Sequence, residues 1–266
     1  MKIKTLRRIA QTATLTAIFL IPLLNVFELY FIKGTFYSMD IGDAAIADPL
    51  AVFQSMLASG TVNPYMIGSL IIPIALMLLL GRVWCSWFCP YYFIAEMMEK
   101  LRKVLKMKPF KPEYTEGYHH RQAKYRYIFL FIGLLVMSVI GVPILNLISA
   151  PGIISSQALV LVKFGYVTFE LVFVAVLIFL ELFYYRWWCR LFCPTGTFLS
   201  FFRMKRGMTV RKVTAECSNC LTCVRTCPMM INPMTMGESG HCNNCGDCVD
   251  ACPDNRKKDT LKFTFR

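Results

Sequence analysis

All twelve cysteines of this 266-residue chain lie in four short groups, and cysteine thiolates are the ligands that iron–sulfur clusters prefer. Two groups, at 217–228 and 242–253, read CSNCLTCVRTCP and CNNCGDCVDACP. Both have the spacing C-x2-C-x2-C-x3-C-P, which is the run of bacterial two-cluster ferredoxins. In that arrangement three cysteines of one run hold a [4Fe–4S] cluster, and the fourth cysteine ligates the cluster of the other run.

This spacing predicts two [4Fe–4S] clusters with mixed ligand sets. The first set is Cys217, Cys220, Cys223 and Cys252, and the second is Cys242, Cys245, Cys248 and Cys227. Zinc sites are the alternative for closely spaced CxxC pairs, but two complete matching runs favour iron–sulfur clusters. So short a segment cannot bury a large core, so metal ligation is expected to supply most of its folding free energy. Ligating thiols must stay reduced, which favours a cytoplasmic location over an oxidising one.

The other two cysteine groups form an internal repeat, RVWCSWFCP at 82–90 and RWWCRLFCP at 186–194. Its cysteines are Cys85, Cys89, Cys189 and Cys193. Residues four apart share a face if the preceding helix continues through them, with the proline redirecting the chain afterwards. Three interpretations are open: buried structural thiols, a redox dithiol or two separate metal-handling pairs, and one additional centre shared by all four thiols. A redox or metal role is favoured over the structural one.

The elements that must position these cysteines are strongly apolar. Hydrophobic residues make up 56% of the chain and the mean hydropathy is +0.50, which predicts a polytopic membrane protein rather than a soluble domain. Four segments are expected to cross the lipid bilayer, near 9–31, 65–84, 125–147 and 164–185. The first is too long for a signal peptide and lacks a small-residue cleavage site, so it is expected to be retained.

The predicted fold class is therefore a membrane all-α domain joined to a small α+β domain. Residues 1–204 are expected to form four transmembrane helices in two repeated hairpins, each delivering one CxxxCP motif to the same side. Residues 205–266 are expected to form a bacterial two-[4Fe–4S] ferredoxin-like domain. The tryptophans and tyrosines around the CxxxCP motifs are interpreted as an aromatic belt at the membrane interface.

The net charge of +13 is explained by membrane topology rather than by a nucleic-acid partner. Lysine and arginine cluster at the N-terminus, after the second span and after the fourth span, whereas the other two connections carry few basic residues. Because cytoplasmic loops are enriched in basic residues, both termini are predicted to be cytoplasmic. The predicted location is the bacterial inner membrane, crossed several times.

Four spans, two CxxxCP motifs and a C-terminal double ferredoxin run together resemble the NapH-type membrane ferredoxins. The segment DPLAVFQSMLASG at 48–60 also resembles the periplasmic loop of that family. The resemblance implies an electron-transfer subunit of a quinol dehydrogenase, with menaquinol or ubiquinol as the substrate. Its implied partners are a NapG-like periplasmic iron–sulfur protein, a NapC-like cytochrome and a periplasmic nitrate reductase.

The related MauN, NosR and CcoG proteins share parts of this pattern, and they suggest the alternative function. The clusters are predicted to be cytoplasmic while the implied terminal acceptor is periplasmic. A membrane ferredoxin that supports maturation or regulation of another redox enzyme would explain that placement, as would a plain membrane anchor. The chain has no CxxCH motif for haem attachment, and no catalytic residue is predicted, so it is expected to be a component rather than a complete enzyme.

Two polar residues in the first periplasmic connection, Asp48 and Gln54, are the candidates for contacts to a quinol. Asp48 has a second interpretation as a helix N-cap, because Pro49 follows it and proline favours the first position of a helix.

Overall fold

The structure is a computed structural model that describes residues 2–28, 32–42, 44–108, 118–202, 207–213, 217–256 and 259–265. The end of the first predicted span (29–31) and the start of the predicted C-terminal domain (205–206) lie outside these ranges.

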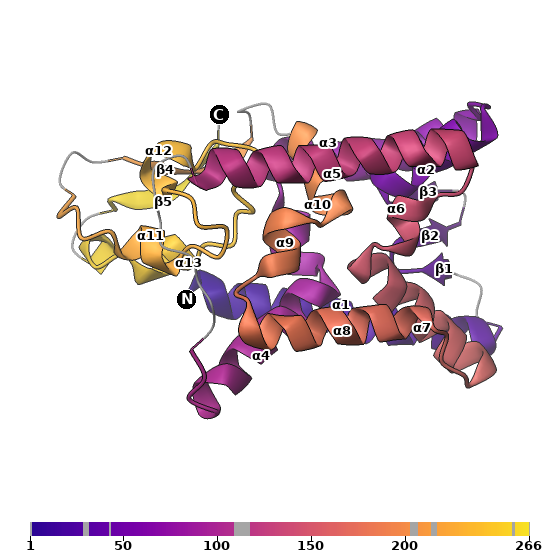
Figure 1. Ribbon diagram of the computed structural model, residues 1–266, viewed down its shortest axis with the longest axis horizontal. Coiled ribbons are helices and arrows are strands. Elements are labelled where there is room, and N and C mark those ends of the chain that lie inside the picture. Colours follow the sequence, from indigo (N-terminus) through magenta and orange to yellow (C-terminus); the bar gives the residue numbers. More distant parts are fainter. Residues whose placement is uncertain are drawn as a thin grey trace.

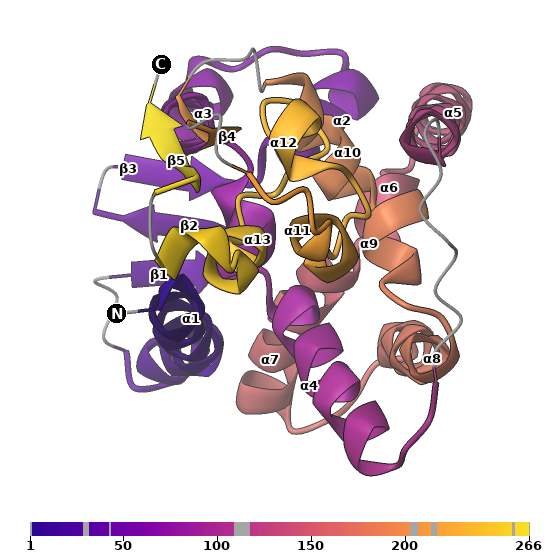
Figure 2. The same cartoon turned by 90° about the vertical axis from the view of Figure 1, so that its left-hand side faces the viewer.

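Four helices run side by side along the long axis of the molecule and are seen end-on in Figure 2. They are α1 (Ile3–Val26), α3 (Pro64–Leu80), α5 (Tyr118–Ile140) and α8 (Glu170–Phe183). Each overlaps one predicted span. Two of them, α1 and α5, are long and apolar enough to cross a membrane; α3 and α8 are shorter, with 17 and 14 residues.

The exposed surface of these long helices is apolar, whereas part of their buried surface is polar. In α1 the buried side carries Arg7, Gln11 and Thr14, while Phe19 and Leu20 are exposed. This is the reverse of a helix on a water-soluble protein, whose polar residues face outward. The pattern fits helices whose outer face meets an apolar environment.

The internal repeat extends well beyond the cysteines. Helices α2 (Pro49–Ser59) and α7 (Ala150–Phe164) occupy equivalent places before α3 and α8. Both have a proline in their first turn, and both end at a left-handed glycine, Gly60 with φ 63° and Gly165 with φ 70°. The cysteine turns η1 (Trp84–Phe88) and α9 (Trp187–Leu191) follow, and then α4 (Pro90–Val104) and α10 (Pro194–Phe201). A short helix, α6 (Ile144–Leu147), joins α5 to α7.

The condition that the preceding helix continues through both cysteines, under which the two thiols would share a helix face, is not met in the first repeat. Helix α3 ends at Leu80, because Gly81 takes φ 67° and ψ −150°, a conformation that no helix interior allows. Cys85 lies instead on a separate π-helical turn, η1, Cys89 directly follows that turn, and Pro90 begins the next helix. In the second repeat Arg186, which corresponds to Arg82, takes a left-handed φ of 51° between the end of α8 and the start of α9.

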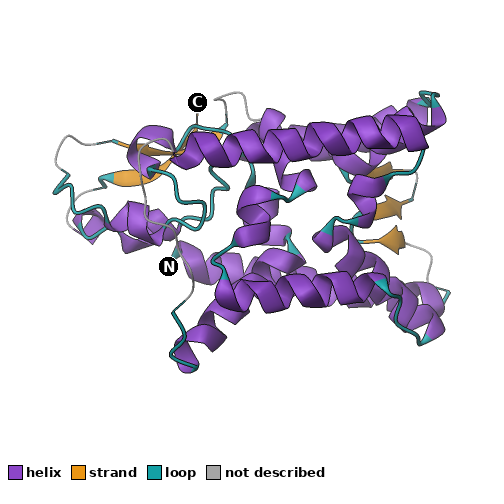
Figure 3. Ribbon diagram, viewed as in Figure 1, coloured by secondary structure: helices purple, strands orange, loops and turns teal. Residues whose placement is uncertain are grey.

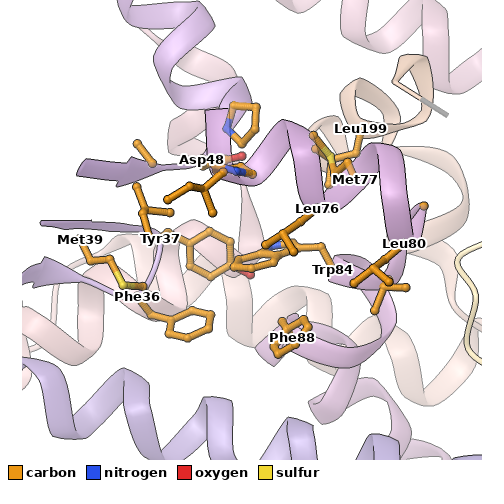
Figure 4. Close-up of a pocket in the computed structure, with 17 residues that line it drawn as sticks. Phe36, Tyr37, Met39, Asp48, Leu76, Met77, Leu80, Trp84, Phe88 and Leu199 are labelled. Carbon is orange, nitrogen blue, oxygen red and sulfur yellow. The ribbon is translucent and has the colours of Figure 1, made fainter. Parts of the chain in front are cut away.

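A small antiparallel sheet fills the connection between α1 and α2, where no strand was predicted. Strands β1 (Ile32–Thr35), β2 (Ser38–Ile41) and β3 (Ala44–Ala47) form a meander in which Thr35 pairs with Ser38. The two-residue turn of the first hairpin therefore consists of Phe36 and Tyr37, and both rings line the pocket drawn in Figure 4.

The C-terminal module lies at one end of the helices, at the left of Figure 1. Its strands β4 (Met208–Lys212) and β5 (Leu261–Phe265) pair antiparallel, with Met208 opposite Phe265. Between them come α11 (Thr222–Thr226), α12 (Pro233–Met236), α13 (Asp247–Ala251) and the 3-10 turn η2 (Asp254–Arg256). Val210, Val224 and Leu261 form its apolar core together with cysteine side chains. The helix and strand content of this module is shown more clearly in Figure 3.

Buried charges attach this module to the helices. Arg7 of α1 is fully buried, donates to the carbonyl oxygen of Cys245 at 2.5 Å, and forms ion pairs with Glu96 of α4 and with Asp247 of α13. A second attachment uses Asn244, whose side-chain amide donates to the Leu80 carbonyl at 2.8 Å. The loop of the second ferredoxin run therefore rests on the ends of α1 and α3.

Replacing Arg7 by glutamine is expected to destabilise the docked module strongly. The change leaves Glu96 and Asp247 without their shared cation, and losing one partner of a buried ion pair costs about 3–5 kcal/mol. Thermal unfolding in detergent, followed through the absorbance of the clusters, measures this loss. Arg8→Gln is the matched control, because Arg8 is partly exposed and reaches Glu96 only at 4.0 Å. Equal loss in both variants would contradict the docking role.

Candidate functional site

The second predicted ligand set surrounds one cavity inside the C-terminal module. Cys227, Cys242, Cys245 and Cys248 line this cavity of about 10 Å³, and all four are buried. Cys227 comes from the first run and lines this cavity together with the three cysteines of the second run. Burial raises the pKa of the Cys227 thiol to about 12, so it becomes a thiolate ligand only together with a metal cation.

The first predicted set lies nearer the surface. Cys223 is buried, which raises the pKa of its thiol, and the neighbouring thiols of Cys252 and Cys217 raise it further. Cys220 is exposed. The loop between these cysteines is held by Ser218, whose backbone N–H and hydroxyl both donate to Asp254 at 2.9 Å. Each predicted ligand set consists of four thiols, three from one run and one from the other, and four cysteine thiolates are the donor set that a [4Fe–4S] cluster takes.

The four CxxxCP cysteines lie together, between the two repeats. Cys85, Cys89, Cys189 and Cys193 line a single cavity of about 30 Å³, which we call the thiol cavity. Of the three interpretations open from the sequence, this arrangement favours the one in which all four thiols act together. No group of three or more His, Cys, Asp or Glu side chains among the described residues could hold a single metal ion, and this also applies to the ferredoxin cysteines.

A larger, apolar cavity of about 320 Å³ lies next to the thiol cavity (Figure 4). Aliphatic and aromatic side chains from the β1–β2 turn, α3 and η1 line it, and its only polar side chains are Tyr37, Asp48 and Trp84. This size and this lining, mostly apolar with a few polar groups, are typical of a site for a small organic ligand. The hydroxyl of Tyr37 is buried and has no partner at hydrogen-bonding geometry among the described residues.

Asp48 and Gln54, the two candidates for quinol contacts, have different places in the structure. Asp48 lines the apolar cavity, caps α2 by accepting from the Leu50 N–H at 3.3 Å, and has its pKa raised to about 6 by burial. Gln54 is fully buried outside that cavity, donates to the Leu50 carbonyl and accepts from the Asn146 N–H. Gln54 therefore joins two helices, and its contact with a quinol stays a prediction.

The three cavities form a continuous series because neighbouring cavities share wall residues. Tyr37 and Trp84 line both the apolar cavity and the thiol cavity. Met229 and Asn243 line both the thiol cavity and the buried ferredoxin cavity. Direct hydrogen bonds fix the second junction: Ser86, between the two cysteines of η1, donates to the Asn243 carbonyl at 2.6 Å.

Sequence reasoning misplaced several residues around these cavities. The aromatic-belt interpretation is wrong for Tyr91 and Trp188, which are buried, and Trp84 stacks on Phe36 with ring centroids 5.7 Å apart. Arg82, counted as a topological charge, is only 2% exposed. Its recurrence as Arg186 in the repeat, at equal distance before the cysteines, was the signal that could have identified a functional position.

Comparison with known proteins adds two findings. A family profile described as "4Fe-4S binding domain" matches residues 62–108 and 166–212, so each matched segment contains one CxxxCP motif. The methylamine utilization ferredoxin-type protein MauN of Paracoccus denitrificans is 30% identical over 244 residues, which are 88% of this chain and 79% of that protein.

Two further relatives show the same extent of similarity. The ferredoxin-type protein NapH of Escherichia coli is 27% identical over 76% of this chain and 67% of its own length. An uncharacterised protein of Methanocaldococcus jannaschii is 29% identical over 86% of this chain and 84% of its own length. No solved structure matches the chain.

Proposed function

This chain belongs to the NapH and MauN family of ferredoxin-type proteins, and we propose that it takes electrons from a membrane quinol at the apolar cavity. It is an iron–sulfur electron-transfer protein; the quinol, the direction of transfer and the four membrane spans are parts of the proposal. The observation that carries it is the series of three cavities with shared walls, which leads from an apolar ligand site to the ferredoxin cysteines.

The chemistry of a quinol matches the groups around the apolar cavity. Oxidation of a quinol releases two electrons and two protons. When bound, the two [4Fe–4S] clusters supply two one-electron acceptors. The apolar walls accommodate the ring and tail, and the Tyr37 hydroxyl is available to a quinol oxygen. The Asp48 carboxylate can accept one of the two protons, and the other passes to water.

The placement of the elements supports transfer across the membrane. The β1–β2 turn belongs to the connection that the charge distribution assigns to the periplasmic side, and the C-terminal module belongs to the cytoplasmic side. We propose that a NapG-like periplasmic iron–sulfur protein and a NapC-like cytochrome are the partners, with a periplasmic nitrate reductase as one terminal acceptor. The MauN relatives are named for methylamine utilization, so other members of the family serve other pathways.

Asp48→Asn is expected to slow quinol-dependent reduction of the clusters by about 10²-fold, the usual contribution of a positioned general base. Because burial raises the pKa of Asp48 to about 6, the carboxylate that accepts the proton predominates above that pH. The wild-type rate should therefore rise as the pH increases through about 6, and the variant should lack this rise. Anaerobic stopped-flow absorbance with a soluble menaquinol analogue measures both.

Asp40→Asn is the matched control, since Asp40 lies on the same sheet but is exposed. A quinol that fails to reduce the wild-type clusters at any pH would sink the proposal. The alternative, a role in maturation or regulation of another redox enzyme, predicts instead that a partner reductase keeps its quinol-dependent activity when Cys217 and Cys242 are both replaced by serine.

A further inference from the structure

The thiol cavity is built by both repeats. Cys85 lies on η1 and Cys89 directly follows it, while Cys189 lies on α9 and Cys193 at the start of α10. The sequence could not show that the two CxxxCP pairs share one cavity, because they lie about a hundred residues apart in the chain.

Two buried arginines beside these thiols have no carboxylate partner. Arg82 and Arg126 are each 2% exposed, and neither forms an ion pair with an acidic side chain among the described residues. Nη1 of Arg82 donates to the Gly240 carbonyl at 2.7 Å, and Nε of Arg126 donates to the Thr197 hydroxyl at 3.2 Å. Buried cations need an anion nearby, because desolvation without a partner costs several kcal/mol per ion.

The free ends of both guanidinium groups meet at the thiols. Nη2 of Arg82 lies 3.8 Å from Sγ of Cys85. A Cβ atom built on Gly196 would lie 3.1 Å from Nη2 of Arg82, 3.4 Å from Sγ of Cys193 and 3.7 Å from Nη2 of Arg126. That last nitrogen has no hydrogen-bond partner among the described residues. Two cations therefore converge on two of the four cysteines, one from each repeat.

The surroundings of the sulfurs also resemble those of cluster ligands. The Gly196 N–H donates to Sγ of Cys193 at 3.3 Å, and hydrogen bonds of this kind tune cluster potentials.

We propose that Cys85, Cys89, Cys189 and Cys193 ligate one iron–sulfur cluster of their own, held between the repeats with Arg82 and Arg126 as its counter-charges. This is a third cluster for the chain, and the net negative charge of four thiolates around iron and sulfide is the anion that the two arginines lack. The number of clusters that the chain holds does not depend on whether a quinol binds at the apolar cavity, so this inference is tested separately from the proposed function.

The test is the iron and acid-labile sulfide content of the full chain, purified anaerobically in detergent. We expect more than the roughly eight irons of two [4Fe–4S] clusters, by about two to four. The Cys85→Ser/Cys189→Ser variant should lose that excess and keep the electron paramagnetic resonance signals of the ferredoxin clusters. Ser138→Ala is the control: Ser138 is exposed on α5, its replacement removes no thiol, and the variant should retain the full iron content.

A second variant tests the proposed counter-charge without removing a cysteine ligand. Arg126→Gln should leave the iron content unchanged and shift the potential of the additional centre to more negative values, because removing a nearby positive charge disfavours the reduced state. Arg121→Gln, exposed on the same helix, should shift nothing. About eight irons in wild type with intact ferredoxin signals, or an excess that survives in the double cysteine variant, would overturn the proposal.

Discussion

Replacing Cys227 by serine is expected to remove the buried ferredoxin cluster, although Cys227 belongs to the run that holds the other one. Its thiol lines the cavity of Cys242, Cys245 and Cys248, so the change removes a ligand there and about four irons with it. Because this cavity is the one that shares walls with the thiol cavity, quinol-dependent reduction of the remaining cluster should fall to background. The loss of folding energy should also loosen the module.

The identity of the surviving cluster can be read from its exposure. In Cys227→Ser the survivor is the outer cluster beside the exposed Cys220, which an iron chelator should strip quickly. Cys252→Ser is the matched variant, because it should leave the buried cluster, which should resist the same chelator. Survivors with the opposite sensitivities, or loss of both clusters in both variants, would contradict the crossed ligand assignment.

Gly207→Ala is expected to separate the C-terminal module from the helices. Gly207 precedes β4 with φ 79°, and a Cβ atom there would overlap the backbone carbonyl oxygens of Leu78 and Leu79 at the end of α3. Backbone atoms cannot move aside as a side chain can, so strain and clash together should cost about 2–4 kcal/mol. Limited proteolysis of the module in the detergent-solubilised protein measures the separation.

Gly42→Ala provides the control for that change. Gly42 has φ 60°, so alanine meets similar backbone strain there, but its Cβ would have no neighbour within 4 Å. We expect a cost of about 1 kcal/mol or less at Gly42 and no release of the module. If the two variants behave alike, the contact of Gly207 with α3 does not hold the module in place.

The parts of the site that depend on local spacing were predictable from the sequence. The ferredoxin runs specify a loop geometry within twelve residues each, and the fold places Cys227 around the same cavity as Cys242 and Cys245. The repeat of the CxxxCP motif predicted two equivalent units, and α2 and α7 share the same first and last turns. Both features are encoded over short distances, where residue type limits conformation.

The parts that depend on tertiary packing were not predictable. The segment around Tyr37 carries the turn residues Gly34 and Gly42, but they do not specify which residues pair across a hairpin. The place of Tyr37 at two cavities follows only from packing against α3 and η1. Arg82 begins the repeated motif at 82–90, and the sequence shows its charge but not its burial. The break at Gly81 likewise ends α3 at Leu80, inside the predicted span 65–84.

The junction between the module and η1 constrains the order in which this protein can be assembled. Met229 and Asn243 close one side of the thiol cavity, and the hydrogen bond from Ser86 holds that closure. Under the topology and the additional cluster proposed above, iron and sulfide supplied from the cytoplasmic side would reach these cysteines freely only before the module docks. Both repeats would then insert first, their shared site would receive its cluster next, and the ferredoxin module would fold and dock over that site last.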